Sequence, residues 1–222
     1  MHPSRFCLLA LLPLFAGCQL LAPSAPETRT LQPRLQGEIS QSGSQLLFRP
    51  CQEQRHFVLS EAANSDLLRS SQRLLSDGHP HLFADLRGSL SASADQRHDG
   101  ALAVSQLYRL QGEGHGCADE QFQQTLVRAS GHEPSWSLRV GSQGMVLDRP
   151  GQEPLALPYL EEQLPEGRLH LSSEANGQRL GLWLTPGTCR DSMSGAVQHL
   201  SAELRLNDQV LRGCGYFGGA RQ

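Results

Sequence analysis

The chain has 222 residues, of which 38% are hydrophobic and 18% charged, with 22 glycines and 13 prolines. These values fit one large or two small folded domains rich in loops, and they exclude a coiled coil or a disordered chain. The formal net charge of -3 excludes a basic platform for nucleic acid. All 19 cationic side chains are arginines, which excludes Schiff-base chemistry and the Ser-x-x-Lys nucleophile.

Residues 1–17 have the features of a secretory signal peptide. Arg5 stands in a short polar start, an apolar run over residues 6–15 follows, and Ala16 and Gly17 are the small residues expected before a cleavage site. The apolar run is too short to span a membrane, which takes about 20 residues. We therefore expect a secreted mature chain.

The sequence at the expected cleavage site, LFAGC at residues 14–18, resembles the bacterial lipobox. The resemblance implies a lipoprotein whose Cys18 carries palmitate-type acyl chains, and two or three such chains anchor a protein stably. Gln19 follows in place of the Asp that holds many such lipoproteins at the inner membrane, so we expect attachment to the outer membrane, facing the periplasm. The prolines and small polar residues among residues 18–35 predict a lipidated, flexible tether.

Four cysteines of the mature chain are left for disulfides: Cys51, Cys117, Cys189 and Cys214. An even number in the oxidising periplasm predicts two disulfides, for which three pairings are possible. If the chain forms two domains, the pairs are Cys51–Cys117 and Cys189–Cys214. The sequence has no Cys-x-x-Cys motif, which argues against a thioredoxin-like or zinc site.

Residues 36–118 have the pattern of a small barrel. The expected elements are strands at 37–40, 45–49 and 56–59, a helix at 64–76, and strands at 81–89 and 101–111. Five strands with a helix between the third and fourth is the topology of the oligonucleotide/oligosaccharide-binding (OB) fold. The layout resembles the OB-type domain of NlpE-like envelope lipoproteins, including a cysteine after the second strand. Few aromatic side chains and the lack of a basic groove argue against nucleic acid as a partner.

Residues 119–222 show no helix signal and predict a second barrel. Strand patterns separated by turn residues occur at 124–129, 135–140, 144–148, 168–172, 179–184, 197–206 and 209–214. Seven or eight antiparallel strands in about 100 residues make a small closed barrel. The predicted fold class is therefore mainly β, with an OB-like five-stranded barrel over residues 36–118 and an antiparallel barrel over residues 119–222.

Three strings in the second half carry a specific resemblance: SGHEPSW at 130–136, CRDSMSG at 189–195 and GCG at 213–215. Together they resemble the C-terminal domain of a family of bacterial envelope lipoproteins with META/HslJ-like barrels, in which the pattern reads GNEPxW…CxDxMSG…GC. His132 stands where that family usually has Asn. The resemblance implies the barrel architecture and the envelope compartment, and it implies no particular chemistry.

The first string offers a candidate site at His132 and Glu133, which could act as an acid/base pair or hold a metal. The alternative is a turn in which Pro134 fixes the backbone, Glu133 accepts hydrogen bonds from backbone amides or an arginine, and Trp136 fills the core. We predict the turn, since an arginine fork matches a carboxylate and arginine is the only cation available.

The second string, with Asp191, Met193, Ser194 and Gly195, invites comparison with a serine hydrolase. The nucleophile elbow needs a glycine two residues before the serine, and Ser192 stands there instead. We predict a turn in which the Asp191 carboxylate and the hydroxyls bond nearby backbone, and in which Gly195 adopts a positive φ.

Metal binding is a further alternative. Imidazoles at His79, His81 and His115 with the thiol of Cys117 would suit copper or zinc, and copper is what the NlpE-like resemblance suggests. A disulfide at Cys117 would remove the thiolate. We therefore expect neither a metal nor another cofactor.

These observations predict a non-enzymatic lipoprotein with a binding or envelope-homeostasis role. Its expected partners are the membrane, through the lipid, and a protein or other envelope component. The alternative is an enzyme or sugar-binding protein that acts on cell-wall fragments through His132 and Glu133. A concave apolar cavity around these two side chains would favour the alternative, and a position in a strand turn would favour the first hypothesis.

Overall fold

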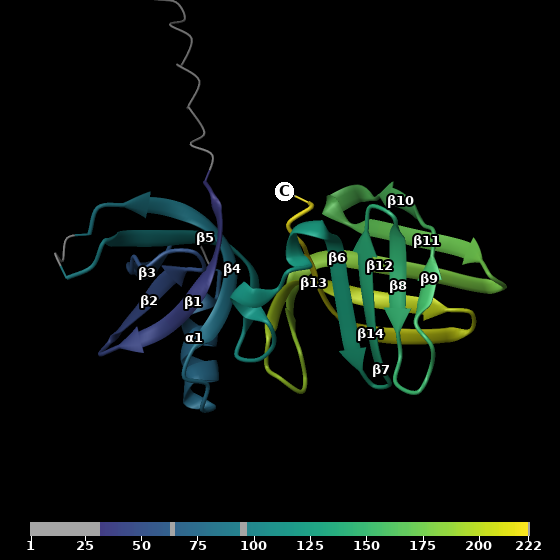
Figure 1. The fold of residues 1–222 in the computed structure, drawn as a ribbon, viewed down its shortest axis with the longest axis horizontal. Coiled ribbons are helices and arrows are strands. Elements are labelled where there is room, and N and C mark those ends of the chain that lie inside the picture. Colours follow the sequence, from purple (N-terminus) through teal and green to yellow (C-terminus); the bar gives the residue numbers. More distant parts are fainter. Residues whose placement is uncertain (1–31, 63–64, 94–96, 222) are drawn as a thin grey trace, which may run out of the picture. The chain divides into compact units, whose positions relative to one another are not determined.

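The computed structural model describes residues 32–62, 65–93 and 97–221 (Figure 1). The predicted signal peptide, Cys18 and most of the predicted tether lie outside these residues. Residues 32–222 form one compact unit that is mainly β. Within the described residues, no helix is long and apolar enough to cross a membrane.

The first half forms a closed five-stranded barrel with one helix. Its elements are β1 (Arg34–Ser42), β2 (Gln45–Pro50), β3 (Phe57–Glu61), α1 (Leu67–Ser76), β4 (Leu82–Ser91) and β5 (Gly100–Gln111). Strand β1 pairs with β2 and β4, β2 pairs with β3, and β4 pairs with β5, all antiparallel. A parallel pairing of β3 with β5 closes the ring. This strand order, with the helix between β3 and β4, confirms the predicted OB-like barrel.

Helix α1 packs one face onto this barrel. Leu67 and Leu74, seven residues apart and therefore on the same side of a helix, are both buried with the barrel side chains. The helix begins at Leu67 rather than at the predicted residue 64, because Asp66 has a φ of 54°, which a right-handed helix does not allow.

The second half contains nine strands. They are β6 (Thr125–His132), β7 (Ser135–Gly141), β8 (Gly144–Asp148), β9 (Leu155–Leu157), β10 (Leu160–Gln163), β11 (Leu169–Ala175), β12 (Gln178–Arg190), β13 (Val197–Leu206) and β14 (Gln209–Phe217). Three short 3-10 turns complete the chain: η1 (Gly116–Ala118), η2 (Phe122–Gln124) and η3 (Pro165–Gly167). The strands pair in the order β9-β8-β7-β6-β14-β13-β12-β11-β10. All seven predicted strands are present, and β9 and β10 were not predicted.

Strands β9 and β10 together close the second barrel. They are separated only by Pro158 and Tyr159; β9 pairs with β8, and β10 pairs with β11. Residues 155–163 therefore act as one bent eighth strand, and the ring is completed by its backbone rather than by a ladder between β9 and β10. Alternation does not predict this strand, because Pro154, Pro158 and nearby glutamates interrupt the pattern.

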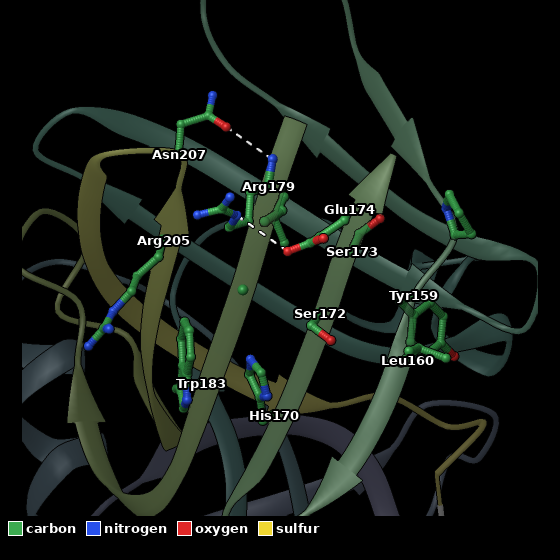
Figure 2. Close-up of a pocket in the computed structure, with 13 residues that line it drawn as sticks. Tyr159, Leu160, His170, Ser172, Ser173, Glu174, Arg179, Trp183, Arg205 and Asn207 are labelled. Atoms are coloured by element: carbon green, nitrogen blue, oxygen red, sulfur yellow. Dashed lines mark hydrogen bonds and ion pairs between the residues drawn. The ribbon is translucent and has the colours of Figure 1, made fainter. Parts of the chain in front are cut away.

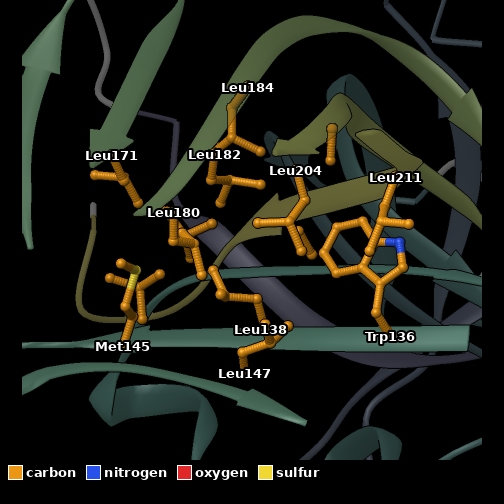
Figure 3. Packing of buried hydrophobic residues seen from close by; sticks show 14 of the residues in the cluster. Trp136, Leu138, Met145, Leu147, Leu171, Leu180, Leu182, Leu184, Leu204 and Leu211 are labelled. Carbon is orange, nitrogen blue, oxygen red and sulfur yellow. The ribbon is translucent and has the colours of Figure 1, made fainter. Parts of the chain in front are cut away.

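The second barrel surrounds its own hydrophobic core (Figure 3). Trp136 and Leu138 from β7 face leucines such as Leu182 from β12 and Leu204 from β13. Trp136 is only 3% exposed, in the core position predicted for it. Buried side chains alternate with more exposed ones along β7 and β13 and over residues 182–185 of β12, as a barrel wall requires.

Both predicted disulfides are present, Cys51–Cys117 and Cys189–Cys214, with S–S distances of 2.04 and 1.99 Å. Each links residues on one side of the predicted boundary at residues 118/119. The sheet itself continues across this boundary, because β13 pairs with β5 at two positions. The division into two domains therefore remains a prediction.

Arg34, the first residue of β1, joins the start of the fold to its end. Its guanidinium donates to both carboxylate oxygens of the buried Asp85, at 2.9 and 2.6 Å. It also donates to the backbone carbonyls of Phe217, Gly218 and Arg221. A buried bidentate pair of this kind fixes geometry, and here it holds β1 against the C-terminal residues.

Candidate functional site

Two of the strings singled out in the sequence meet in space. His132 is the last residue of β6 and Asp191 follows β12, and the His132 Nε2 lies 2.8 Å from the Asp191 Oδ2. No pattern in the sequence predicts this contact between the two strings. Nothing local connects residues 59 positions apart, so only the pairing of strands around the barrel brings them together.

Asp191 is buried, and its carboxylate accepts several hydrogen bonds from groups of its own turn. It accepts hydrogen bonds from the N–H groups of Met193 (3.1 Å) and Ser194 (2.8 Å) and from the Ser194 hydroxyl (2.8 Å). Burial alone would raise the pKa of Asp191, but the bonds from Ser194 and the contact with His132 outweigh it, so this pKa lies below its usual value. Residues 191–195 form a tight turn in which Gly195 has a φ of 68°.

Glu133 and Pro134 are the two residues of the turn between β6 and β7, and both are exposed. In the described part of the chain, the Glu133 carboxylate has no hydrogen-bond or ion-pair partner. The expectation that backbone amides or an arginine would bond Glu133 is therefore wrong. At the centre of a two-residue turn, its side chain projects past the end of the sheet into solvent.

His132 borders a shallow surface hollow with Ser135 and Trp136, and Glu133 does not contribute to it. His132 and Glu133 thus lie at the turn between β6 and β7 and do not line a common cavity. The exposed Met193 side chain, 75% accessible, lies at the tip of the second turn.

A larger hollow of about 700 Å³ lies on the wall of the second barrel, beside the bend in its closing strand (Figure 2). The residues that line it are Pro158, Tyr159, Leu160, His170, Ser172, Ser173, Glu174, Arg179, Leu180, Gly181, Trp183, Arg205 and Asn207. They come from the bend itself, from β10, β11, β12 and β13, and from the turn after β13. The volume is within the range of small-molecule sites.

Three of the side chains that line this hollow, His170, Trp183 and Arg205, form a row across β11, β12 and β13. His170 faces Trp183 across the β11–β12 pair, and their rings stack with centroids 4.2 Å apart. The Arg205 guanidinium lies 4.6 Å from the centroid of the Trp183 ring. Figure 2 shows Trp183 standing between His170 and Arg205, while Tyr159 and Leu160 border the opposite side of the hollow.

The hydrogen bond to Glu162 determines that the Nδ1 of His170 carries a hydrogen. The Nδ1 of His170 lies 2.8 Å from the Glu162 Oε2. An ionised carboxylate only accepts, so this Nδ1 carries a hydrogen and donates it to Glu162. The Nε2 is buried and has no hydrogen-bond partner among the described residues.

Ser173 provides a second polar atom without a partner. Its side chain is only 6% exposed, and its Oγ forms no hydrogen bond within the described residues. Ser173 pairs with Leu180 and shares its face of β11 with Leu169 and Leu171, so its Oγ lies on the core side of the wall, opposite to His170. Most buried polar atoms in folded proteins are hydrogen-bonded, so the unpartnered His170 Nε2 beside the hollow indicates a place for a ligand or ordered water.

Gly181 leaves space for the aromatic row. A Cβ at this position would lie 2.5 Å from the Trp183 ring and 3.3 Å from the His170 Nε2. The alternation over residues 180–184 already shows Gly181 and Trp183 to be the outward positions of this strand. An outward tryptophan beside an outward glycine is the one signal in the sequence that could have located this site.

The structure also bears on the proposed metal ligands. Cys117 is bonded to Cys51, so it offers no thiolate beside His115. Over the described ranges, His, Cys, Asp and Glu side chains form no group of three or more that could hold a metal ion.

The chain is a mainly β protein with a hollow on the outer wall of its second barrel. Comparison of the chain with protein-family models, with curated proteins and with solved structures finds no match. The resemblances to NlpE-like and META/HslJ-like lipoproteins therefore remain predictions.

Proposed function

We propose that this protein is a periplasmic lipoprotein anchored to the outer membrane, with a non-enzymatic role in binding an envelope component through the hollow beside Pro158 and Tyr159. The observation that carries the proposal is the His170 Nε2, a buried polar atom without a partner among the described residues, in the lining of this hollow. Anchoring rests on the lipobox-like string that ends at Cys18.

A non-enzymatic role is supported by the way the residues of the two strings bond each other. The Ser194 hydroxyl donates to Asp191 and not to His132, so the serine is held as part of a turn. A nucleophile needs a base within hydrogen-bond reach of its own hydroxyl. The alternative, an enzyme or sugar-binding protein acting through His132 and Glu133, has less support because Glu133 is exposed and apart from the hollow that His132 borders.

The binding site is tested by placing a photo-crosslinking amino acid at Ser172 in the hollow and, separately, at Glu133 in the exposed turn, in cells that make the full chain. We expect adducts with an envelope component at position 172 and none at position 133. The reverse result would support the alternative site, and the lack of adducts at position 172 would refute the proposed binding role.

The anchor is tested with Cys18→Ser and with Cys7→Ser as the matched control inside the signal peptide. Cys18→Ser should move the protein to the soluble periplasmic fraction and abolish labelling by a palmitate analogue, because the acylated thiol is lost. Cys7→Ser should change neither. If Cys18→Ser protein still fractionates with membranes, the lipoprotein assignment is wrong.

A further inference from the structure

We infer that Arg128 and Arg139, on the outer face of β6 and β7, together bind a phosphate group. This site is separate from the hollow lined by His170 and Trp183, so the inference goes beyond the proposed function and does not depend on it. Three observations support it: the two arginines face each other across a strand pair, neither has a partner among the described residues, and a further hollow lies beside Arg139.

Strand register places the two arginines side by side. Arg128 of β6 and Arg139 of β7 are direct partners in this antiparallel ladder. Their neighbours along the strands, such as Val127 and Leu138, are buried in the barrel core, so both arginine side chains leave the outer face of the wall. Like charges directly opposite each other on a sheet are destabilising, and an anion between them offsets the repulsion.

Neither guanidinium has an ion-pair or hydrogen-bond partner in the part of the chain that the structure describes, although both side chains are half-buried. Other arginines of the second barrel do have partners; Arg205, for example, donates to Glu203 at 2.9 Å. Arg149, just after β8, is the one further exception among the described residues of this barrel. A partly buried charge without a partner is costly, so the wall gains from an anion at this position.

Carboxylates of neighbouring segments do not compensate the two arginines. Asp119 lies 3.9 Å from the buried Arg109, and Glu161 accepts from both Nη atoms of Arg221, at 3.0 and 2.9 Å. Asp148, exposed at the end of β8, forms no ion pair within the described residues. Two cations against this one exposed carboxylate leave a positive surface, which favours an anion over a cation.

A hollow of about 970 Å³, called here the Arg139 hollow, has room for the rest of such a ligand. Its lining includes Gly141 and Gly144, which pair across β7 and β8 at outward positions and carry no side chains. Among the described residues that line it, Arg139 is the only charged one, and the others are neutral, with amides such as Gln143 and apolar groups such as Val146. This lining fits a ligand with one anionic group and a neutral body.

A phosphate group matches two guanidinium groups better than a carboxylate does. One guanidinium donates two parallel hydrogen bonds to an oxyanion, so a single arginine already occupies both oxygens of a carboxylate. A phosphate monoester has three acceptor oxygens and a charge of about −1.5 to −2 at neutral pH. It can therefore accept from Arg128 and Arg139 together and neutralise both.

The experiment titrates the full mature chain, carrying Cys18→Ser, with phenyl phosphate, inorganic phosphate and benzoate, and follows binding by calorimetry at low salt. Phenyl phosphate and benzoate present a phosphate and a carboxylate on the same neutral ring. We expect both phosphate compounds to bind, and benzoate to bind about tenfold or more weakly than phenyl phosphate, because it can engage only one of the two guanidinium groups.

Variants tie binding to the two arginines. Arg128→Gln and Arg139→Gln should each weaken phenyl phosphate binding about tenfold or more, the effect of losing a charge-assisted hydrogen bond. Arg149→Gln is the matched control, since it removes another unpartnered arginine and the same charge, and it should leave the affinity nearly unchanged. Without ligand, Arg139→Gln should not lower the urea midpoint, because it relieves a repulsion; a purely structural arginine would lower it.

A further variant tests the Arg139 hollow without changing any charge. A Cβ at Gly141 meets nothing closer than 3.4 Å, so Gly141→Leu should be accommodated and should fill part of the hollow. We expect it to weaken the binding of phenyl phosphate, whose ring needs this space, more than the binding of inorganic phosphate.

Vesicles distinguish the two sources of a phosphate group, a lipid headgroup and a soluble compound. Phosphatidylcholine vesicles with and without phosphatidic acid are sedimented with the Cys18→Ser chain and with its Arg139→Gln variant. Cosedimentation that requires both phosphatidic acid and Arg139 assigns a headgroup, and phenyl phosphate binding without it assigns a soluble phosphate compound. The inference is overturned if neither phenyl phosphate nor phosphatidic acid binds, if benzoate binds as tightly as phenyl phosphate, or if Arg139→Gln weakens binding no more than Arg149→Gln.

Discussion

Two histidines of the second barrel, His132 and His170, each lie 2.8 Å from a carboxylate, but their surroundings differ. Around His132, the carboxylate of Asp191 is buried and accepts three more hydrogen bonds from its own turn. Around His170, the carboxylate of Glu162 is 63% exposed, and the ring Nε2 is buried and has no hydrogen-bond partner in the part of the chain that the structure describes.

The difference shows that the polar atoms of a histidine–carboxylate pair can be used by the fold in one place and left partly unused in another. Where all the polar atoms of a cluster bond one another, the cluster stabilises the fold and has little left to offer a ligand. Where a buried donor or acceptor has no hydrogen bond, its desolvation lowers the stability of the fold, and a ligand that bonds this atom can offset the loss. The turn at residues 191–195 belongs to the first kind and the wall hollow to the second.

The largest effect on the free energy of unfolding is expected when the tryptophans of the two regions, Trp136 and Trp183, are truncated. Trp136→Ala should lower the free energy of unfolding by about 3–5 kcal/mol, the usual cost of truncating a large core side chain. Trp183→Ala should cost clearly less, because the Trp183 ring is half-buried on the outer wall. Urea denaturation of both variants measures this. Equal losses would mean that the aromatic row is part of the core and not the border of a site.

A smaller effect is expected at the turn. Asp191→Asn should lower the free energy of unfolding by about 1–3 kcal/mol at neutral pH, because buried hydrogen bonds to a charged acceptor are lost or weakened. The folded pKa of Asp191 lies below its unfolded value of about 3.9, so its contribution is complete at neutral pH and is lost as the pH falls through the folded pKa.

Urea midpoints of wild type and Asp191→Asn should therefore converge as the pH is lowered below about 4. Glu162→Gln, at the corresponding position of the other histidine, is the control and should shift the midpoint less, since Glu162 is mostly exposed. A pH-independent gap between wild type and Asp191→Asn would contradict the role given to the ionised carboxylate.

The smallest effect is expected for Glu133→Gln. The carboxylate is exposed and has no partner within the described residues, so its charge contributes nothing specific to the fold. The urea midpoint should stay where it is in wild type. A measurable shift in either direction would show that Glu133 is engaged in the folded protein and would reopen the His132/Glu133 site.

Much of the fold was predictable because local patterns and covalent limits determine it. The alternation of apolar residues predicted the strands of both barrels, and the helix between the third and fourth strands predicted the order of the first. The eighth strand of the second barrel was not predictable by the same means, because Pro158 interrupts it and its two halves pair with different neighbours. The candidate site arises at this interruption.

The sequence by itself determined the mainly β class, the two-barrel layout, the burial of Trp136 and, given two domains, the disulfide pairs, because these depend on periodicity and on the number of cysteines. Only the tertiary structure decided that His132 meets Asp191, that Glu133 remains in solvent, and that His170 and Trp183 line one hollow with Tyr159. Those outcomes depend on strand register, which places residues far apart in the chain within hydrogen-bond distance and which no local pattern encodes.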